Sequence, residues 1–196
     1  MVSKYEASFT GMFDGVDEMI RTTDNPRHKQ ILLNYRRHGL LEVSQRWDEL
    51  LDPAMTVEHP VYRMNEGPSS ILLDGREMVE SFYRDLVDSG ASVLWPTDQK
   101  VAVSDWGFAA EATFLHFVPG KLLAAAGEQI DDPDATYLVK HLLAMFWPYA
   151  EDGRLIGEHV YEDGTSREIM KPDPEDVITP ADARRLLEPV LENAPA

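Results

Sequence analysis

The sequence predicts an α+β fold in which helices pack in the concavity of a bent, mixed and mostly antiparallel sheet. Two observations lead to this prediction. Helical periodicity over Asn25–Leu51 comes before most of the strand-like segments, and residues 136–163 contain two apolar runs joined by the tetrapeptide EDGR at 151–154. Asp-Gly between β-prone runs favours a tight hairpin, because glycine adopts the positive φ that such turns need. Helices followed by hairpin-linked strands are typical of the α+β class.

We expect three helices in the first half of the chain. Residues 1–21 place apolar side chains at roughly helical spacing, which predicts a short helix packed on the body. The longest helix is predicted over Asn25–Leu51, because Asn is a good N-cap, Pro26 fits the first turn, and Asp-Pro at 52–53 ends the helix. Residues 74–87 begin with capping-box spacing and continue with an apolar helical face, which predicts the third helix.

The other segments up to residue 163 are predicted to be strands and turns. Their expected bounds are a strand over Met55–Met64, a turn at 65–69, strands over Val93–Trp95, Lys100–Ser104 and Phe108–Phe117, a loop with one helical turn at 121–135, and strands over Tyr137–Trp147 and Leu155–Tyr161. The strand over Tyr137–Trp147 is apolar on both faces, which is typical of a central strand covered on both sides. Its odd-numbered residues should share one face, and His159, Tyr161 and Asp163 should share a face of the next strand.

This order predicts one domain at residues 25–164, with an N-terminal helical extension at 1–24 and a C-terminal extension at 165–196. The C-terminal extension begins with a polar, proline-containing stretch. Thr179 and Pro180 then start a short capped helix. This tail could dock on the body, clasp a neighbouring subunit or fray.

Composition and charge restrict the function classes. The chain has 196 residues, 43% of them hydrophobic, which suits one globular domain with a sizeable core. Asp and Glu (35) outnumber Lys and Arg (18), and the net charge of −17 argues against nucleic acid, an anionic membrane or a polyanionic substrate as partner. The lack of cysteine excludes disulfides, thiolate metal sites and cysteine nucleophiles. No apolar run approaches membrane-spanning length, so we expect a cytoplasmic protein.

Motifs that would indicate a metal or a cofactor are missing from the sequence. There is no H-E-x-x-H, no H-x-H and no Cys/His cluster, so we expect no metal site. Neither a Walker A loop nor G-x-G-x-x-G is present, and no G-x-S-x-G elbow indicates a serine hydrolase. We therefore expect any chemistry to use side chains alone, with no cofactor.

Three segments resemble a known family. They are VEHPVYR at 57–63, LDGREMVESFYRDL at 73–86 and FWPYAEDGRLIGEHVYED at 146–163. In these segments the chain resembles the SnoaL-like polyketide cyclase branch of the nuclear transport factor 2-like superfamily, over roughly residues 27–163. The resemblance implies a cone with a blind apolar pocket between the curved sheet and the long helix. Bacterial lyases that remove formaldehyde from diarylpropane lignin fragments resemble the same branch.

The resemblance implies two function classes. The first is a cofactor-independent acid–base enzyme of lyase, isomerase or cyclase type that acts on a small hydrophobic, aromatic molecule, for example a polyketide ring or a diarylpropane that loses formaldehyde. The alternative is a non-catalytic small-ligand-binding or adaptor protein with the same fold. Polar side chains converging in the pocket would favour the enzyme. The family commonly buries the convex face of its sheet, so we also expect a homodimer or homotrimer.

The predicted catalytic residues are His59, His141, Tyr161 and Asp163, which we expect to converge on one cavity. Part of the family keeps its general acid/base at the position of Asp163, and the alternative there is a solvated carboxylate at the strand end. His59 and His141 are either pocket residues or satisfied core histidines. Tyr161 could donate to an enolate or only stack.

A second set of residues is predicted to form the wall of the pocket and to bind the substrate. These are Tyr35, His38, Trp47, Tyr62, Tyr83, Trp147 and His159. His116 and Glu111 are weaker candidates.

Overall fold

The computed structural model describes residues 2–67 and 69–195 and confirms the α+β class. Six strands form one curved sheet in the order β2-β1-β6-β5-β4-β3, in which β1 and β6 are parallel and all other neighbours are antiparallel. The strands are β1 (Val61–Glu66), β2 (Ser69–Asp74), β3 (Val93–Ser104), β4 (Gly107–Pro119), β5 (Thr136–Pro148) and β6 (His159–Met170). The helices are α1 (Glu6–Thr10), α2 (Asp14–Thr22), α3 (Pro26–Val43), α4 (Trp47–Leu50), α5 (Arg76–Asp88), α6 (Gly120–Ala125), the 3₁₀ helix η1 (Pro174–Asp176) and α7 (Pro180–Glu192). Among the described residues, no helix is both long and apolar enough to cross a membrane.

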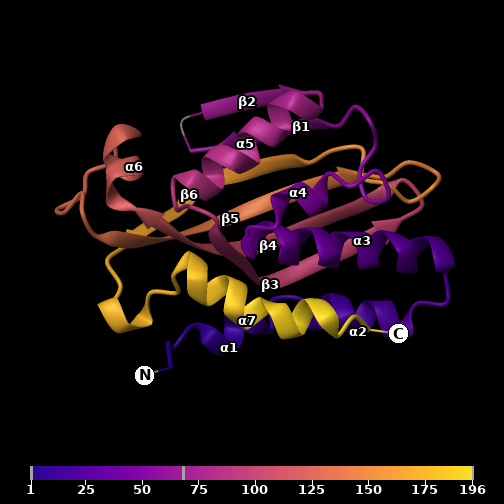
Figure 1. The fold of residues 1–196 in the computed structure, drawn as a ribbon, viewed down its shortest axis with the longest axis horizontal. Helices are drawn as coiled ribbons and strands as arrows, with labels where there is room; N and C mark the ends of the chain where they lie inside the picture. Colours follow the sequence, from indigo (N-terminus) through magenta and orange to yellow (C-terminus); the bar gives the residue numbers. More distant parts are fainter. Residues whose placement is uncertain (1, 68, 196) are drawn as a thin grey trace.

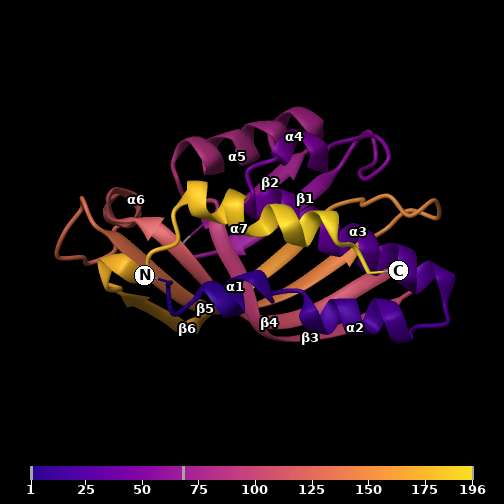
Figure 2. The same cartoon turned by 60° about the horizontal axis from the view of Figure 1, so that its bottom comes forward.

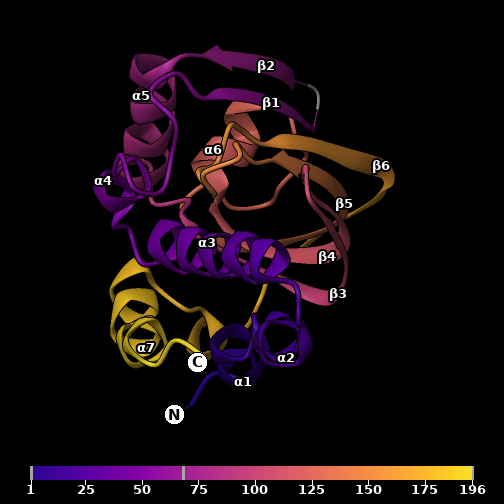
Figure 3. The same cartoon turned by 90° about the vertical axis from the view of Figure 1, so that its right-hand side faces the viewer.

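The sheet bends around α3, which lies in its concavity (Figure 3). The buried face of α3 includes Ile31, Tyr35 and Leu40, whose side chains pack in one apolar core with residues from the concave face of the sheet. At the free edge a register shift between Thr97 and Lys100 interrupts β3. Such irregularities increase the local bend of a strand.

The long helix is shorter than predicted. Asn25 caps α3 as expected, because its side chain accepts hydrogen bonds from the backbone N–H groups of Arg27 and His28. The helix ends at Val43, however, and Gln45 adopts a positive φ of 62°. This conformation cannot continue an α-helix, so the rest of the predicted helix becomes the separate short helix α4.

The N-terminal helical segment also consists of two helices, α1 and α2, instead of one. At the other end of the chain, Thr179 and Asp182 form the predicted capping box at the start of α7. Helix α7 lies beside α1 and α3 (Figure 2). The buried guanidinium of Arg36 fixes this arrangement, because it pairs with Asp17 of α2 at 2.6 Å and donates to the carbonyl of Val190 at 3.0 Å.

The first edge of the sheet differs from the prediction. Strand β1 begins at Val61 and not at Met55, and the unpredicted strand β2 pairs with it antiparallel. The turn expected at 65–69 overlaps residue 68, which lies outside the described residues. The predicted capping box of the third helix does not form, because Gly75, with φ 99°, is the N-cap of α5, whose described contacts include no capping side chain.

The predicted hairpin connects β5 and β6, but the second strand begins at His159 and not at Leu155. Gly153, with φ 88°, turns the connecting loop, and Leu155 forms single bridges to Tyr149 and Thr56. In β6, Val160 pairs with Met145. Farther along, Leu142 pairs with Asp163 and Lys140 with Glu168, so residues 164–167 form a bulge opposite His141. Strand β6 therefore extends beyond residue 164.

The convex face of the sheet exposes two large rings. Phe146 is 43% exposed and Tyr161 is 42% exposed, and their ring centroids lie 6.2 Å apart. The self-association expected from the sequence stays a prediction, and this face gives it a test. We expect Phe146→Ser to lower the molar mass measured by light scattering, because it removes an exposed apolar ring from the expected interface between subunits. Equal masses for Phe146→Ser and the wild type would contradict the prediction.

Candidate active site

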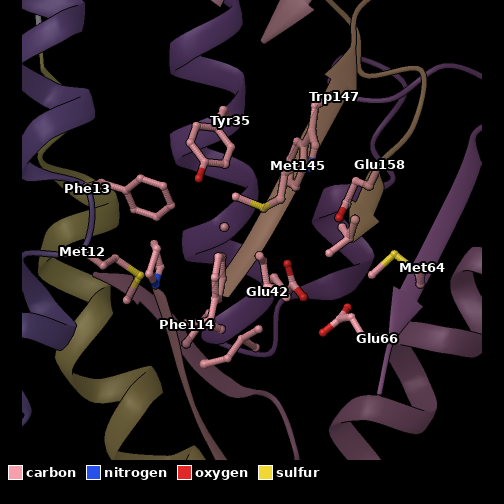
Figure 4. Close-up of a pocket in the computed structure, with 16 residues that line it drawn as sticks. Met12, Phe13, Tyr35, Glu42, Met64, Glu66, Phe114, Met145, Trp147 and Glu158 are labelled. Carbon is pink, nitrogen blue, oxygen red and sulfur yellow. The ribbon is translucent and has the colours of Figure 1, made fainter. Parts of the chain in front are cut away.

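One pocket opens on the concave side of the sheet, between the sheet and α3 (Figure 4). It encloses about 570 Å³ of space, counting its open mouth. Most of its wall is apolar and comes from α3, the turn before α2, and strands β1, β3, β4, β5 and β6. Its lining residues are Met12, Phe13, Tyr35, Gly39, Glu42, Val43, Met64, Glu66, Leu94, Pro96, Phe114, Leu143, Met145, Trp147, Glu158 and Val160.

Three carboxyl groups from different elements face this apolar pocket (Figure 4). Glu42 lies in the last turn of α3, on the same helix face as Tyr35 and His38, because residues three, four and seven apart share a face. Glu66 ends β1 and Glu158 directly precedes β6. Burial shifts carboxyl groups toward the neutral form, and it is the main cause that raises the pKa of Glu42 and of Glu66.

Glu158 is held at the centre of a buried hydrogen-bond network. The Tyr83 hydroxyl donates to Glu158 Oε1 at 2.9 Å, and His38 Nε2 lies 3.0 Å from the same oxygen and 3.0 Å from the Tyr83 hydroxyl. The His38 side chain is fully buried, and that of Glu158 is 5% exposed. A carboxylate and a hydroxyl whose proton is already donated can only accept, so His38 Nε2 carries a proton here. The network stabilises the Glu158 charge inside the cone.

Burial and neighbouring carboxyl groups raise the pKa of the other two carboxyl groups. Burial, and then repulsion from Glu158 and Glu66, raise the pKa of Glu42 well above its ordinary value. Burial, followed by repulsion from Glu162 and Glu158, raises the pKa of Glu66 to about 7, against the opposing effect of Arg167. The raised pKa favours the protonated form of Glu42, and near neutral pH Glu66 can both take and give a proton.

The raised pKa of Glu66 predicts a stability change with pH. The folded protein holds this proton more tightly than the unfolded chain, where the pKa is near 4.5. Stability should therefore fall as pH rises from about 4.5 to about 7, by about 3 kcal/mol at most. Since Glu66→Gln has no charge to bury, we expect it to unfold at higher urea concentration than the wild type at pH 8 and at a similar one at pH 4.5.

The matched control for this prediction is Glu111→Gln, which removes an exposed carboxylate that pairs with Lys100. We expect this control to follow the wild type at both pH values. If Glu66→Gln and the wild type lose stability equally between pH 4.5 and pH 8, Glu66 does not have a raised pKa.

The structure does not bring the four predicted catalytic residues together. His59 precedes β1, its side chain is 69% exposed, and it pairs with Asp74 at 2.8 Å. Tyr161 lies on the convex face against Phe146. Asp163 is exposed and its carboxylate accepts hydrogen bonds from the backbone and hydroxyl of Thr165. These are the solvated carboxylate and stacked ring that were the alternatives.

The expected convergence is wrong because the face of β6 was assigned wrongly. Val160 pairs with the inward-facing Met145, so the even-numbered residues of β6 before the bulge face the interior. Glu158 and Glu162 are therefore inside. The face assignment of β5 is correct, and His141 is buried in the concavity, but outside the pocket described above.

Two of the seven predicted substrate-binding residues, Tyr35 and Trp147, line the pocket. His38 and Tyr83 lie behind its wall, where they bind Glu158. Tyr62 is fully buried beside Tyr83, with ring centroids 6.2 Å apart.

Trp47 and His159 do not line the pocket. The Trp47 ring is half-buried and lies under the guanidinium of Arg84, whose central carbon is 5.6 Å from the ring centroid. His159 is the first residue of β6 and pairs with Phe146, whose side chain faces the convex side, so it lies on the wrong face.

The three carboxyl groups of the pocket were not among the residues predicted from the sequence. Glu42 could have been found from its spacing to Tyr35 and His38 on the apolar side of the helix. Glu66 lies four residues after Tyr62 on the same strand, so the two side chains share a face. An inward-facing Tyr62 therefore implies an inward-facing Glu66.

Comparisons with known proteins support the fold. No protein-family model and no curated protein matches this chain. Similar solved structures include a SnoaL-like polyketide cyclase from Jannaschia sp. CCS1, with 16% identity, coverage of 72% of this chain and 91% of that one, and a TM-score of 0.50. The epoxide hydrolase/cyclase-like enzyme SalBIII has a role in pyran ring formation in the polyether salinomycin. It shares 13% identity, with coverage of 76% of this chain and 98% of that one, and a TM-score of 0.47. A polyketide cyclase from Xanthomonas campestris pv. campestris has 21% identity, coverage of 66% and 91%, and a TM-score of 0.40. The fold is that of the SnoaL-like, nuclear transport factor 2-like cone.

Proposed function

We propose that the protein is a cofactor-independent acid–base enzyme, of lyase, isomerase or cyclase type, that acts on a small hydrophobic, aromatic molecule. The observation that supports it is the convergence of Glu42, Glu66 and Glu158 on one apolar pocket. An adaptor or simple binding protein gains nothing from buried carboxyl groups, which cost stability unless they are protonated or hydrogen-bonded.

The three carboxyl groups suit different roles. Glu66 has a pKa of about 7, close to that of an efficient general base at neutral pH. Protonated Glu42 can donate a hydrogen bond to the substrate oxygen on which negative charge collects. Burial, and then repulsion from Glu158, which His38 and Tyr83 hold in place, raise the pKa of Glu42 and favour its protonated form.

These roles fit several reactions on an aromatic substrate. In a polyketide ring closure, Glu66 would remove a C–H proton and the resulting enolate carbon would attack a carbonyl, whose oxygen then takes a proton from Glu42. In formaldehyde loss from a diarylpropane, Glu66 would remove the hydroxymethyl proton, the C–C bond would break, and the substrate carbon would regain a proton from Glu42. Both sequences balance without an oxidant or a metal.

The pocket chemistry favours a neutral substrate. Rings such as Phe13, Tyr35 and Trp147 offer apolar and aromatic contact area, whereas the carboxyl groups repel anions. The cytoplasmic location, the homodimer or homotrimer and a boundary at residue 24 remain part of this proposal. The boundary expected at residue 164 falls inside β6, so the domain extends at least to Met170.

Incubation of the protein with ring-containing polyketides and diarylpropane lignin compounds, without added cofactor, tests the proposal. We expect a product detected by mass spectrometry, or an isomer of unchanged mass resolved by chromatography. A compound that binds to the pocket without being converted, at any pH between 5 and 9, would support the ligand-binding alternative instead.

A further inference from the structure

A second hollow lies at the far end of the concave face, between α6 and strands β4, β5 and β6. Figure 1 shows α6 at the end of the molecule away from the loop that joins α2 to α3. The hollow encloses about 1020 Å³, counting the space open to solvent, and it meets the first pocket at Glu66, which lines both. The other lining residues are Gly67, His116, Val118, Leu122, Leu123, Ala125, Ala126, Val139, His141 and Arg167.

His141 lines this hollow and carries a buried nitrogen without a hydrogen-bond partner among the described residues. Its side chain is 3% exposed and its Nδ1 lies 3.0 Å from Oε1 of Glu162, whose side chain is 2% exposed. Because Glu162 also accepts hydrogen bonds from Arg167 and from the backbone N–H of Gly67, it acts as a carboxylate, and Nδ1 of His141 must carry the proton. Nε2 of His141 is buried and has no hydrogen-bond partner among residues 2–67 and 69–195.

The free nitrogen is a hydrogen-bond acceptor. Burial is the main cause that lowers the pKa of His141, which keeps the imidazole neutral near pH 7. A neutral ring with its proton on Nδ1 has a bare lone pair on Nε2. In proteins, a carboxylate that binds one nitrogen of a histidine fixes the tautomer. The lone pair of the other nitrogen is then free to accept a hydrogen bond or a proton. A buried acceptor without a partner also costs free energy, which a donor group in the hollow would recover.

Two other polar side chains of the hollow, His116 and Arg167, already have partners. His116 Nε2 lies 2.6 Å from the carbonyl of Ala91 and donates to it, and burial lowers the pKa of His116 to about 4. Arg167 pairs with Glu162 at 2.8 Å and with Glu128 at 3.2 Å. Its described lining residues therefore offer apolar walls from α6, acceptors at His141 Nε2 and at Glu66 on the border with the first pocket, and no open positive charge for an anion.

We propose that this hollow is a second binding site, which takes an apolar molecule with a hydroxyl group, and that His141 Nε2 accepts the hydrogen bond from that hydroxyl. The bulge at 164–167 builds the site, because it brings Arg167 onto Glu162 and so fixes the carboxylate that orients His141. The site goes beyond the acid–base role proposed for the first pocket and does not depend on it, since it requires binding and no turnover.

The test compares phenol with anisole, which has a similar shape but lacks the hydroxyl proton. In the wild type we expect phenol to bind about tenfold more tightly than anisole. Phenol can donate a hydrogen bond to the buried acceptor, whereas anisole leaves it without a partner. Nuclear magnetic resonance of the histidine nitrogens should show His141 with its proton on Nδ1, and phenol should shift the Nε2 signal. Methyl signals of Leu122 and Leu123 should move with it.

Two variants complete the test. His141→Phe keeps an apolar ring but removes the acceptor, so phenol should bind only as tightly as anisole, while the affinity for anisole stays the same. His159→Phe changes a histidine on the opposite face of the sheet and should leave both affinities unchanged. If His141→Phe does not fold, the wild-type nitrogen signals decide the question alone.

Three results would overturn the proposal. They are equal affinities for phenol and anisole in the wild type, a proton on Nε2 of free His141, and phenol-induced shifts confined to Met145 in the first pocket. Failure of the first pocket to catalyse a reaction would leave the second site standing.

Discussion

The Glu66→Gln variant will convert substrate about a hundred- to ten-thousand-fold more slowly than the wild type, which is the usual cost of losing a positioned acid–base group. The amide has nearly the shape of the carboxyl group, but it cannot take up a proton at neutral pH. The loss should therefore fall on kcat, with little change in KM if substrate dissociates faster than it reacts. In the wild type, kcat/KM should rise with pH through about pH 7 as Glu66 ionises. This rise should be absent from the variant.

Glu111→Gln is the matched control, because it makes the same chemical change on an exposed carboxylate paired with Lys100. Its rate and pH profile should equal those of the wild type. The two predictions for Glu66→Gln also support each other, since the variant should be both slower and more stable at pH 8. If the Glu66→Gln protein keeps the wild-type rate, another group in the pocket is the base, and the role given to Glu66 is refuted.

Gly157→Ala will destabilise the protein by about 3 kcal/mol, the upper end of what overpacking costs. A Cβ at Gly157 would lie 1.8 Å from the carbonyl oxygen of Val61, so the backbones must separate. Two hydrogen bonds hold them together on either side: Val61 N–H donates to the carbonyl oxygen of Ile156 at 3.0 Å, and Arg63 N–H donates to the backbone carbonyl oxygen of Glu158 at 2.7 Å. We expect the melting temperature to fall by roughly 6–12 °C. Separation would also displace Glu158.

Gly164→Ala provides the comparison, because a Cβ at that position would meet no described atom within 4 Å. We expect it to unfold within about 0.5 kcal/mol of the wild type, as most surface changes do. Similar melting temperatures for Gly157→Ala and Gly164→Ala would show that the contact between Val61 and the chain before β6 is not tight.

The parts of the fold that local chemistry determines could be predicted from the sequence. The cap at Asn25, the capping box at Thr179 and the two-sided apolar pattern of β5 all depend on neighbours close in the chain. The end of α3 could not be predicted in this way, because apolar spacing continues past Val43 while Gln45 reverses the backbone.

The candidate site was harder to predict, because it depends on register between distant segments. The direction in which Tyr161 and Asp163 point follows from the pairing of Val160 with Met145, which the ten-residue loop at 149–158 sets and no local pattern reveals. A shift of one residue turns every side chain of a strand to the other face. Glutamate side chains are also usually exposed to solvent, so a sequence pattern gives no reason to place three of them inside a cone.

The buried carboxyl groups link occupancy of the first pocket to proton uptake. An apolar guest expels water from around Glu42 and Glu66, which makes their charged forms still less favourable. Binding above pH 7 should then draw protons from the surrounding buffer. In titration calorimetry, the apparent heat of binding would vary with the ionisation enthalpy of the buffer chosen, and the slope of that variation would count the protons taken up. A bound guest thus raises the pH at which Glu66 is ionised and can act as the base.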